Sequence, residues 1–216
     1  MVSEQRYSRQ SGMIPMDRLQ ELGVTIIGCG AGGRNVAIQL AAMGVTKMQL
    51  IDFDTVEEHN IASQGFLESQ IGIPKVDAVA QSCKAINVDM QIEKLYSKYK
   101  RSMNTHQIIF CCVDSISTRK FIFEHVCCDL FIDARMQGET IRVLAAWNPE
   151  THEHYASTLF AQAEAHRGAC TAKTTLYCAS IDAGWMVSMY TKWLRDSLIS
   201  CDVMINVLAD EITVLK

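Results

Sequence analysis

Three closely spaced glycines stand where the backbone could approach the phosphates of a nucleotide. An apolar stretch over residues 24–27 runs into a G-x-G-x-x-G motif formed by Gly28, Gly30 and Gly33. Glycine lets the backbone come close to phosphate oxygens, and the helix that follows offers its N-terminal N–H groups to them. A second apolar stretch ends in Asp52, where a carboxylate can accept hydrogen bonds from ribose hydroxyls. The motif predicts an adenine-nucleotide site, but it does not separate a redox cofactor from ATP.

Two further residues favour ATP over a nicotinamide cofactor. Lys75 ends the run Gly72-Ile73-Pro74-Lys75 and falls in the first turn of a predicted helix, close to the expected phosphates. Asp114 follows the apolar run 107–113, where a carboxylate could hold Mg²⁺ that bridges phosphates. A dehydrogenase needs neither residue at these places, whereas an enzyme that cleaves a phosphoanhydride needs both.

The elements that must position these residues alternate between strands and helices. Beyond the first strand–helix–strand unit, strands are expected at 90–96, 107–113, 130–134 and 140–147, and helices at 74–85, 116–126 and 174–196. The segment 150–171 looks irregular, and 203–208 with 212–215 is expected to form a closing hairpin. This order predicts an α/β fold, with a Rossmann-like, doubly wound, mostly parallel sheet, helices on both faces and an antiparallel C-terminal extension. In such a sheet the glycine loop, Asp52 and Asp114 meet at the carboxyl ends of the strands.

The bulk composition fits one ordinary globular domain. The 216 residues are 49% hydrophobic and 20% charged, which suits a single domain over 1–216 with a substantial core. The net charge of −4 gives no reason to expect nucleic acid as a partner. The first residues form no apolar signal region, and no apolar run approaches membrane-spanning length, so we expect a cytoplasmic protein without a membrane partner.

Five motifs in this order resemble the ThiF, MoeB and HesA family of activating enzymes, which is related to the ubiquitin-activating enzymes. The resemblance extends from Arg6 to beyond Ala172. The matching segments are the R-Y-x-R-Q opening at 6–10, the glycine loop at 28–33, D-x-D-x-V at 52–56, G-x-P-K at 72–75 and the strand-ending Asp114.

The resemblance implies an adenylyltransferase that uses ATP and Mg²⁺. Its substrate would be the C-terminal carboxylate of a small ubiquitin-like or sulfur-carrier protein ending in glycine, with release of pyrophosphate. That carboxylate is already ionised at neutral pH, so the enzyme must position two anions and neutralise the departing pyrophosphate. The implied site residues are Lys75 at the phosphates, Asp114 at Mg²⁺, Asp52 at the ribose, Asp54 beside it, and Asn60 with Gln64 around the phosphate pocket. The residue matching Arg9 reaches the γ-phosphate from the neighbouring subunit, which implies a homodimer.

One position departs from the family pattern. The family has an arginine in N-x-x-R-Q, where this chain has Ser63. Either Arg34, in the first turn after the glycine loop, substitutes for the missing cation, or Arg34 is a solvated helix residue. A third interpretation is that the site is weakened and that the chain is one half of a heterodimer.

Cys170 is a candidate for a covalent step. The run Cys170-Thr171-Ala172-Lys173 is similar to the crossover region in which many family members carry a cysteine that takes the carrier as a thioester or persulfide. A following helix N-terminus and nearby basic residues favour the thiolate. Other family members work without this cysteine. In a chain with nine cysteines, one can fall at this position by chance, so both interpretations, with and without a covalent role for Cys170, stay open. Cys178 and Cys201 are expected to be structural.

Zinc is not expected. The chain has no C-x-x-C pair, and surface histidines are commoner than ligands. The residues that could ligate zinc by type and proximity in the sequence are His152, His154, His166 and Cys170.

Other functions remain open. One is adenylation of a non-protein carboxylate, on a small molecule or an RNA, although no basic patch favours RNA. Another is a non-catalytic subunit that contributes Arg9 to a partner's site. The third is an NAD-dependent oxidoreductase, which Lys75 and Asp114 disfavour.

Overall fold

A computed structural model describes residues 4–160 and 175–215 and contains an eight-stranded sheet in the order β3-β2-β1-β4-β5-β6-β7-β8. The strands are β1 (Gly23–Ile27), β2 (Lys47–Asp52), β3 (Gln91–Tyr96), β4 (Ile108–Cys111), β5 (Leu130–Gln137), β6 (Thr140–Ala146), β7 (Asp202–Asn206) and β8 (Glu211–Val214). Neighbours from β3 to β5 are parallel, and the pairs from β5 to β8 are antiparallel. The expected doubly wound, mostly parallel sheet with an antiparallel C-terminal extension is confirmed.

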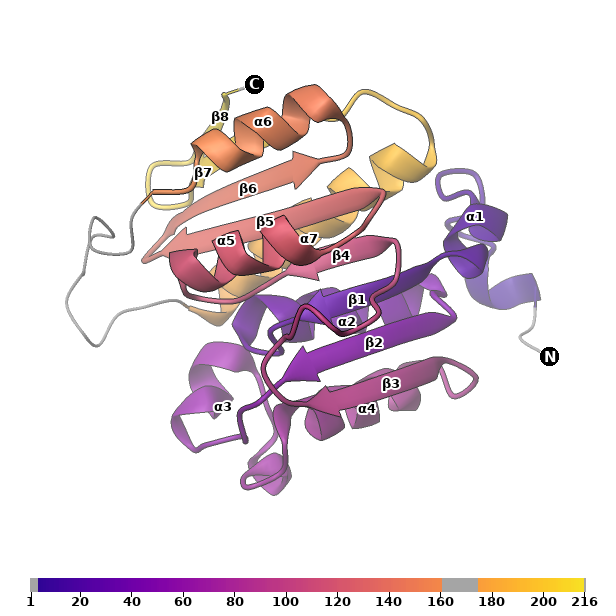
Figure 1. The fold of residues 1–216 in the computed structure, drawn as a ribbon. Helices are drawn as coiled ribbons and strands as arrows, with labels where there is room; N and C mark the ends of the chain where they lie inside the picture. The colour runs from indigo at the N-terminus through magenta and orange to yellow at the C-terminus, as the bar shows by residue number, and fades with distance from the viewer. Residues whose placement is uncertain (1–3, 161–174, 216) are drawn as a thin grey trace.

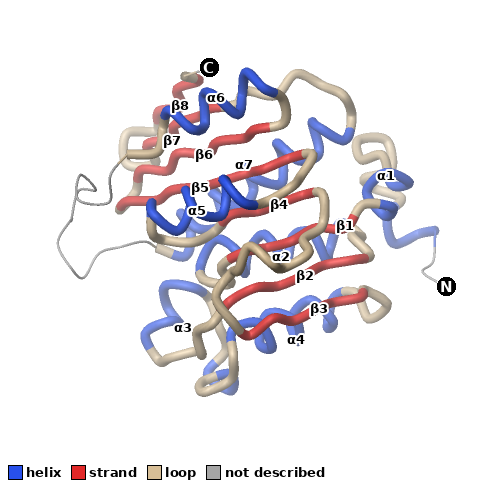
Figure 2. Tube along the Cα trace, viewed as in Figure 1, coloured by secondary structure: helices blue, strands red, loops and turns tan. Residues whose placement is uncertain are grey.

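Helices cover both faces of the sheet (Figures 1 and 2). The α-helices are α1 (Met16–Glu21), α2 (Ala31–Met43), α3 (His59–Gln64), α4 (Lys75–Ile86), α5 (Ile116–His125), α6 (Pro149–Ser157) and α7 (Leu176–Leu194). α2, α4 and α7 pack on one face, where they form the larger hydrophobic core. α5 and α6 cover the other face around a smaller core that includes Ile122, Phe131 and Tyr155.

The burial of each strand follows from its place in the sheet. β1 and β4 lie between two strands and under helices on both faces, and all of their residues are buried. Such central strands read as continuous apolar runs rather than as alternating ones. β3 and β8 form the two edges and are mostly exposed. The strand order therefore explains why the first strand and the 107–113 run are the most apolar.

Local signals fix the ends of the helix that follows the glycine loop. α2 begins after Gly30 and ends at Gly44, whose φ of 105° lies in the left-handed region. The Gly44 N–H donates to the carbonyl oxygens of Leu40 and Ala41 at 3.2 and 3.3 Å, which satisfies carbonyl groups that the helix end would leave open. The helix thus runs from the carboxyl edge of the strands to their amino edge.

The expectation of an irregular segment over 150–171 was wrong for its first part. α6 occupies Pro149–Ser157, and Asn148 caps it by accepting a hydrogen bond from the Thr151 N–H at 2.8 Å. Asn148 followed by proline at the first helical position is a helix start signal that the polar composition of the segment obscures. Residues 161–174 lie outside the described part of the chain. The short helices α1 and α3 and the 3₁₀ turns Glu4–Tyr7 and Glu68–Gln70 were not predicted.

Among residues 4–160 and 175–215, no helix combines the length and apolar character needed to cross a membrane.

Candidate functional site

The glycine loop joins β1 to α2 at the carboxyl edge of the sheet. The Gly28 N–H donates to the Ile51 carbonyl of β2 at 2.9 Å, which fastens the start of the loop to the neighbouring strand. A Cβ on Gly33 would lie 1.8 Å from the carbonyl oxygen of Gly28, so no larger residue fits there. The loop is therefore held tightly, with the N-terminus of a 13-residue helix directly behind it, an arrangement suited to binding an anion.

Asp52 ends β2 and is tied to the same loop. Its side-chain oxygens accept hydrogen bonds from the N–H groups of Cys29 at 2.6 Å and Asp54 at 2.7 Å. Burial raises the pKa of Asp52, while the two N–H donors and the charge of Lys75 oppose that rise. Each carboxylate oxygen keeps a second lone pair, so the group can also accept a hydrogen bond from a hydroxyl.

Lys75 and Asp54 form an ion pair next to Asp52. The Lys75 Nζ lies 3.0 Å from Asp54 Oδ2, and the lysine side chain is only 8% exposed, against 47% for the aspartate. The Lys75 N–H also donates to the Asp54 carbonyl at 2.9 Å. The first turn of α4 is thereby fixed against the end of β2, and the predicted lysine is brought to the predicted acids.

The short helix α3 supplies the next part of the site. Asn60 is buried, and its Oδ1 accepts a hydrogen bond from the Glu57 N–H at 2.9 Å, so it holds the turn that precedes α3. Gln64 has a buried Oε1 without a hydrogen-bond partner among the described residues. A Cβ on Gly30 would lie 3.7 Å from that oxygen, which places Gln64 at the glycine loop. Ser63 donates its hydroxyl to the His59 carbonyl at 2.9 Å within the helix.

Arg34 extends from α2 toward the end of α3. A Cβ on Gly65 would lie 3.0 Å from Arg34 Nη1, and the guanidinium carbon is 5.4 Å from the centre of the Phe66 ring. Burial lowers the pKa of Arg34, and no carboxylate in the described part of the chain contributes to that shift. The Arg34 Nε is buried and has no hydrogen-bond partner among the described residues. A half-buried cation without an anion is unfavourable unless a ligand supplies one. The contact with Gly65 places the Arg34 guanidinium at the end of α3, the short helix that contains Ser63. Ser63 is the position at which the resemblance leads us to expect an arginine.

Asp114 lies where the strand order predicts. It follows the carboxyl end of β4 and is exposed. A Cβ on Gly28 would lie 2.6 Å from the carbonyl oxygen of Cys112, so the turn that carries Asp114 packs against the glycine loop. Within the described residues, no group of three or more metal-ligating side chains is present. A cation at Asp114 would need its other ligands from a substrate or from water.

Arg9 is not brought to this site within one chain. Gln10 donates its amide to the Met43 carbonyl at 2.6 Å, and Tyr7 packs against Gly44, so the N-terminal segment lies at the C-terminal end of α2. Figure 1 shows this segment at the edge opposite the arrowheads of the parallel strands. The length of α2, 13 residues, corresponds to about 20 Å. Within one chain, Arg9 therefore lies away from the candidate site.

The cysteine and histidine candidates separate into two groups. Cys170 and His166 lie outside the described residues. His154 Nε2 lies 2.8 Å from Asp202 Oδ2, and the His152 ring is 5.3 Å from that of Phe123, so both have partners in the fold. Cys178 and Cys201 are both buried, in agreement with a structural role.

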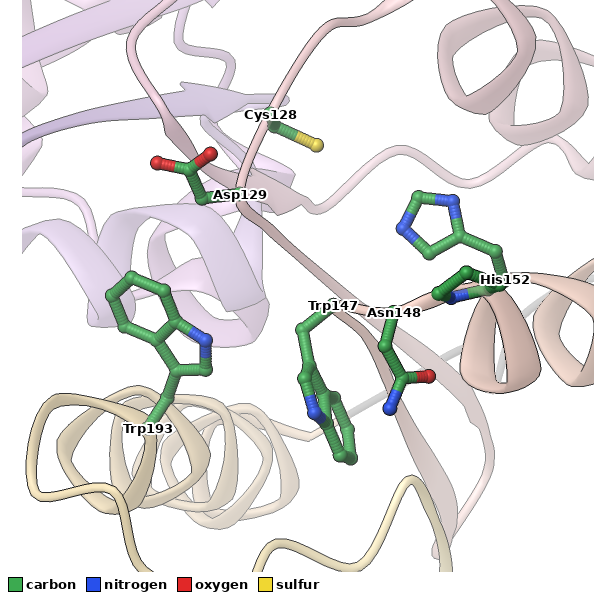
Figure 3. Close-up of a pocket in the computed structure, with 7 residues that line it drawn as sticks. Cys128, Asp129, Trp147, Asn148, His152 and Trp193 are labelled. Atoms are coloured by element: carbon green, nitrogen blue, oxygen red, sulfur yellow. The ribbon is translucent and has the colours of Figure 1, made fainter.

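The candidate site does not coincide with the hollow drawn in Figure 3. That hollow has a volume of about 510 Å³ and lies at the opposite edge of the sheet, before β5 and after β6. Figure 3 shows two tryptophan rings and the Asp129 carboxylate around it. Its lining residues are Cys128, Asp129, Trp147, Asn148, Pro149, His152 and Trp193; of these, only His152 was considered as a ligand, in the zinc set.

Sequence reasoning missed Asp182, which lies on the face of α7 that packs against α2. The residue is only 2% exposed, and its Oδ1 has no hydrogen-bond partner within the described chain. The sequence signal for Asp182 is a single acidic residue, between Ile181 and Ala183, within a long apolar helix.

Comparisons with known proteins agree with this geometry. The ThiF family profile matches residues 3–205. A segment of 77 residues, 36% of this chain and 18% of the relative, is 36% identical to Ubiquitin-like modifier-activating enzyme 5 of Arabidopsis thaliana. A segment of 132 residues is 32% identical to Adenylyltransferase and sulfurtransferase MOCS3 of Xenopus laevis and covers 54% of this chain and 28% of that protein. The chain thus spans less than a third of these two relatives.

A solved structure of E. coli MccB with ATP has the same fold. It superposes with a TM-score of 0.74 at 17% sequence identity, over 98% of this chain and 71% of that one. Because the family profile covers nearly the whole sequence, and the glycine loop, Asp52, Lys75 and Asp114 meet at one edge of the sheet, the chain belongs to the ThiF family.

Proposed function

We propose that this protein uses ATP to adenylate a carboxylate, and that the carboxylate is the C-terminus of a small ubiquitin-like or sulfur-carrier protein. The observation that carries the proposal is the position of two cations, Arg34 at the end of α3 and Lys75 at the end of β2, near the carboxyl edge of the sheet. Arg34 extends from the first turn of α2 and is half-buried beside Gly65, with no carboxylate near it among the described residues, and Lys75 is buried at the end of β2. Such a site attracts phosphate groups. The names of the two curated relatives support activation of a protein carrier.

The residues present fit a nucleotide. The glycine loop offers backbone N–H groups without side chains in the way, and Gln64 carries a polar atom at the loop that no described residue satisfies. Asp52 is held by two backbone donors and retains lone pairs for ribose hydroxyls. E. coli MccB, which shares the fold, has been solved with ATP, and this supports the same ligand here.

In the proposed reaction, the carrier carboxylate attacks the α-phosphorus of ATP, and the bond to the departing pyrophosphate breaks. Lys75 and Arg34 would neutralise the charge that develops on the pyrophosphate, and the N-terminal N–H groups of α2 would orient the phosphates. Asp54 holds the Lys75 ammonium at 3.0 Å and so fixes its position. Asp114 would hold Mg²⁺, which would supply further charge neutralisation.

The first test compares nucleotides directly by thermal unfolding. We expect Mg·ATP, at about 100 times its Kd, to stabilise the chain by about 2.7 kcal/mol, which is a rise in Tm of about 5–10 °C for a chain of this size. NAD⁺ at the same concentration should leave Tm unchanged. Stabilisation by NAD⁺ alone would favour an oxidoreductase, and failure of both ligands would favour a subunit that needs a different partner to complete its site.

We propose a homodimer with shared sites, which the position of Arg9 supports, and two-tag purification tests it. Arg9→Ala and Lys75→Ala variants, each with its own tag, are co-expressed and purified through both tags. One site of the mixed dimer then combines the intact Lys75 of one subunit with the intact Arg9 of the other. We expect about one tight Mg·ATP site per mixed dimer and no tight site in either variant homodimer.

The control is a wild-type dimer carrying the same two tags, which should bind two Mg·ATP molecules. If no doubly tagged complex is recovered, or if the mixed dimer binds as weakly as its parents, Arg9 does not act in a partner's site.

Cys170 gives a second candidate step, in which its thiolate would attack the acyl carbon of the carrier adenylate, form a thioester and release AMP. The helix that follows it and the neighbouring His166, Arg167 and Lys173 motivate this role. A Cys170→Ala variant that still forms the adenylate but no longer forms a reducible or thioester-linked carrier complex would support it.

A further inference from the structure

Asp182 is buried directly behind the first turn of α2. A Cβ on Gly32 would lie 2.8 Å from Asp182 Oδ2, so the absence of a side chain at residue 32 is what makes room for the carboxyl group. The other oxygen, Oδ1, is buried and accepts no hydrogen bond from any described residue. The carboxyl group therefore lies next to the same helix N-terminus that the glycine loop presents to a phosphate.

The surroundings of Asp182 contain little that would stabilise a negative charge. Arg119 of α5 is the one described charged group that lowers its pKa, and Arg119 is itself ion-paired with Asp133. The Cys112 thiol after β4 also faces Asp182, and burial raises the pKa of that thiol. Burial likewise raises the pKa of Asp182, to about 7.

The other charged groups on the elements packed against α7 have different neighbours. They are Arg34 with Phe66, Arg135 with Asp133, Arg142 with Asp202, His59 with Glu57, and Arg18 of α1 with Asp196. No described residue other than Arg119 therefore offsets a charge on Asp182.

We propose that Asp182 couples phosphate binding at the glycine loop to the uptake of one proton, so that the neutral carboxyl group permits binding and the carboxylate opposes it. The proposal rests on the nucleotide site proposed above. A carboxylate and a phosphate at one helix N-terminus compete for the same positive end of the helix and repel each other in a medium of low dielectric constant. Because such coupling is reciprocal, a proton on the Asp182 oxygen strengthens phosphate binding and bound phosphate retains that proton. The proton comes from the solvent, and no covalent bond in the ligand changes.

The coupling predicts a particular pH dependence of Mg·ATP affinity. Below pH 7 the free protein already holds the proton, and affinity changes little with pH. Above pH 7 the free protein loses it, and the Kd of the wild type should rise by up to about tenfold for each pH unit. Asp182→Asn keeps the shape of the side chain without a titrating group, so its Kd should stay flat and should be lower than that of the wild type at pH 8.5.

Calorimetry with Mg·ATP in buffers of different ionisation enthalpy measures the coupled proton directly. At pH 7.5 we expect net proton uptake by the wild type and none by Asp182→Asn, and the difference removes any protonation of the nucleotide itself. Asp129→Asn, at a carboxylate on the opposite edge, is the matched control and should behave as the wild type.

Titration of ¹³C-labelled aspartate in the wild-type protein by NMR provides a measurement that needs no variant. The pKa of the Asp182 resonance should rise when Mg·ATP is added. Mg·ATP binding with equal affinity at pH 6 and pH 8.5, or an Asp182 resonance that the nucleotide leaves unchanged, would overturn the coupling alone. No Mg·ATP binding at pH 6 would overturn both the coupling and the proposed function.

Discussion

Replacing Arg34 by alanine should weaken Mg·ATP binding by about 10–100-fold, the range that one or two charge-assisted hydrogen bonds to phosphate supply. The reason is the position of the guanidinium: it extends from the first turn of α2 to the end of α3, and it is half-buried without a carboxylate near it among the described residues. In the unliganded protein its Nε is buried without a hydrogen-bond partner among the described residues, so we expect its removal to cost ligand binding more than it costs folding. Isothermal calorimetry measures the affinity, and thermal unfolding without ligand measures the stability of the same variant.

A second substitution tests whether Arg34 takes the role of the arginine that the family carries at the position of Ser63. If Arg34 performs the role of the arginine that the family carries where this chain has Ser63, then Ser63→Arg should restore most of the binding lost in Arg34→Ala. Ser63→Arg in the wild type should change affinity little, because one cation already serves the site. An Arg34→Ala variant that binds as the wild type would show that Arg34 does not contact the nucleotide, and loss without rescue would separate its role from that of residue 63.

The central part of the site could be predicted from the sequence because its geometry depends on local patterns. An apolar strand, a glycine loop and a helix define one unit, and parallel pairing brings the end of each strand to the same edge. Gly28, Asp52 and Asp114 needed only the strand assignments, and these were right. Lys75 needed only the start of α4, which the preceding Pro74 indicates.

The remaining parts depend on contacts between distant segments. The burial of Asp182 arises because α7 packs against α2, more than 130 positions away along the chain, and no local pattern reports that packing. The location of Arg9 likewise depends on the contact between Tyr7 and Gly44. α6 was missed for a different reason. Its composition is polar, and its start signal at Asn148 and Pro149 was outweighed by the absence of an apolar periodicity.

One buried cluster supports the loop that carries Asp114. Asp133 of β5 is fully buried and is ion-paired with Arg119 and with Arg135, the latter at 2.9 Å. Tyr155 donates its hydroxyl to the same carboxylate at 3.0 Å. Arg119 also donates to the carbonyl of Val113, the residue before Asp114. A single carboxylate is thus ion-paired with two guanidinium groups, and Arg119 connects it to the end of β4 at the site.

Replacing Asp133 by asparagine should therefore lower the free energy of unfolding by about 3–5 kcal/mol, the usual cost of removing one partner of a buried ion pair. Two arginines would then share no carboxylate, with side chains only 5% and 13% exposed. Urea denaturation at pH 7 measures the change. Tyr155→Phe is the matched control, because it removes one neutral donor from the same carboxylate and should cost about 1 kcal/mol. If both variants lose the same small amount, the two arginines are neutralised by something other than Asp133. A large loss in Asp133→Asn alone would mean that the charge, and not the hydrogen bonds, holds the Asp114 turn in place.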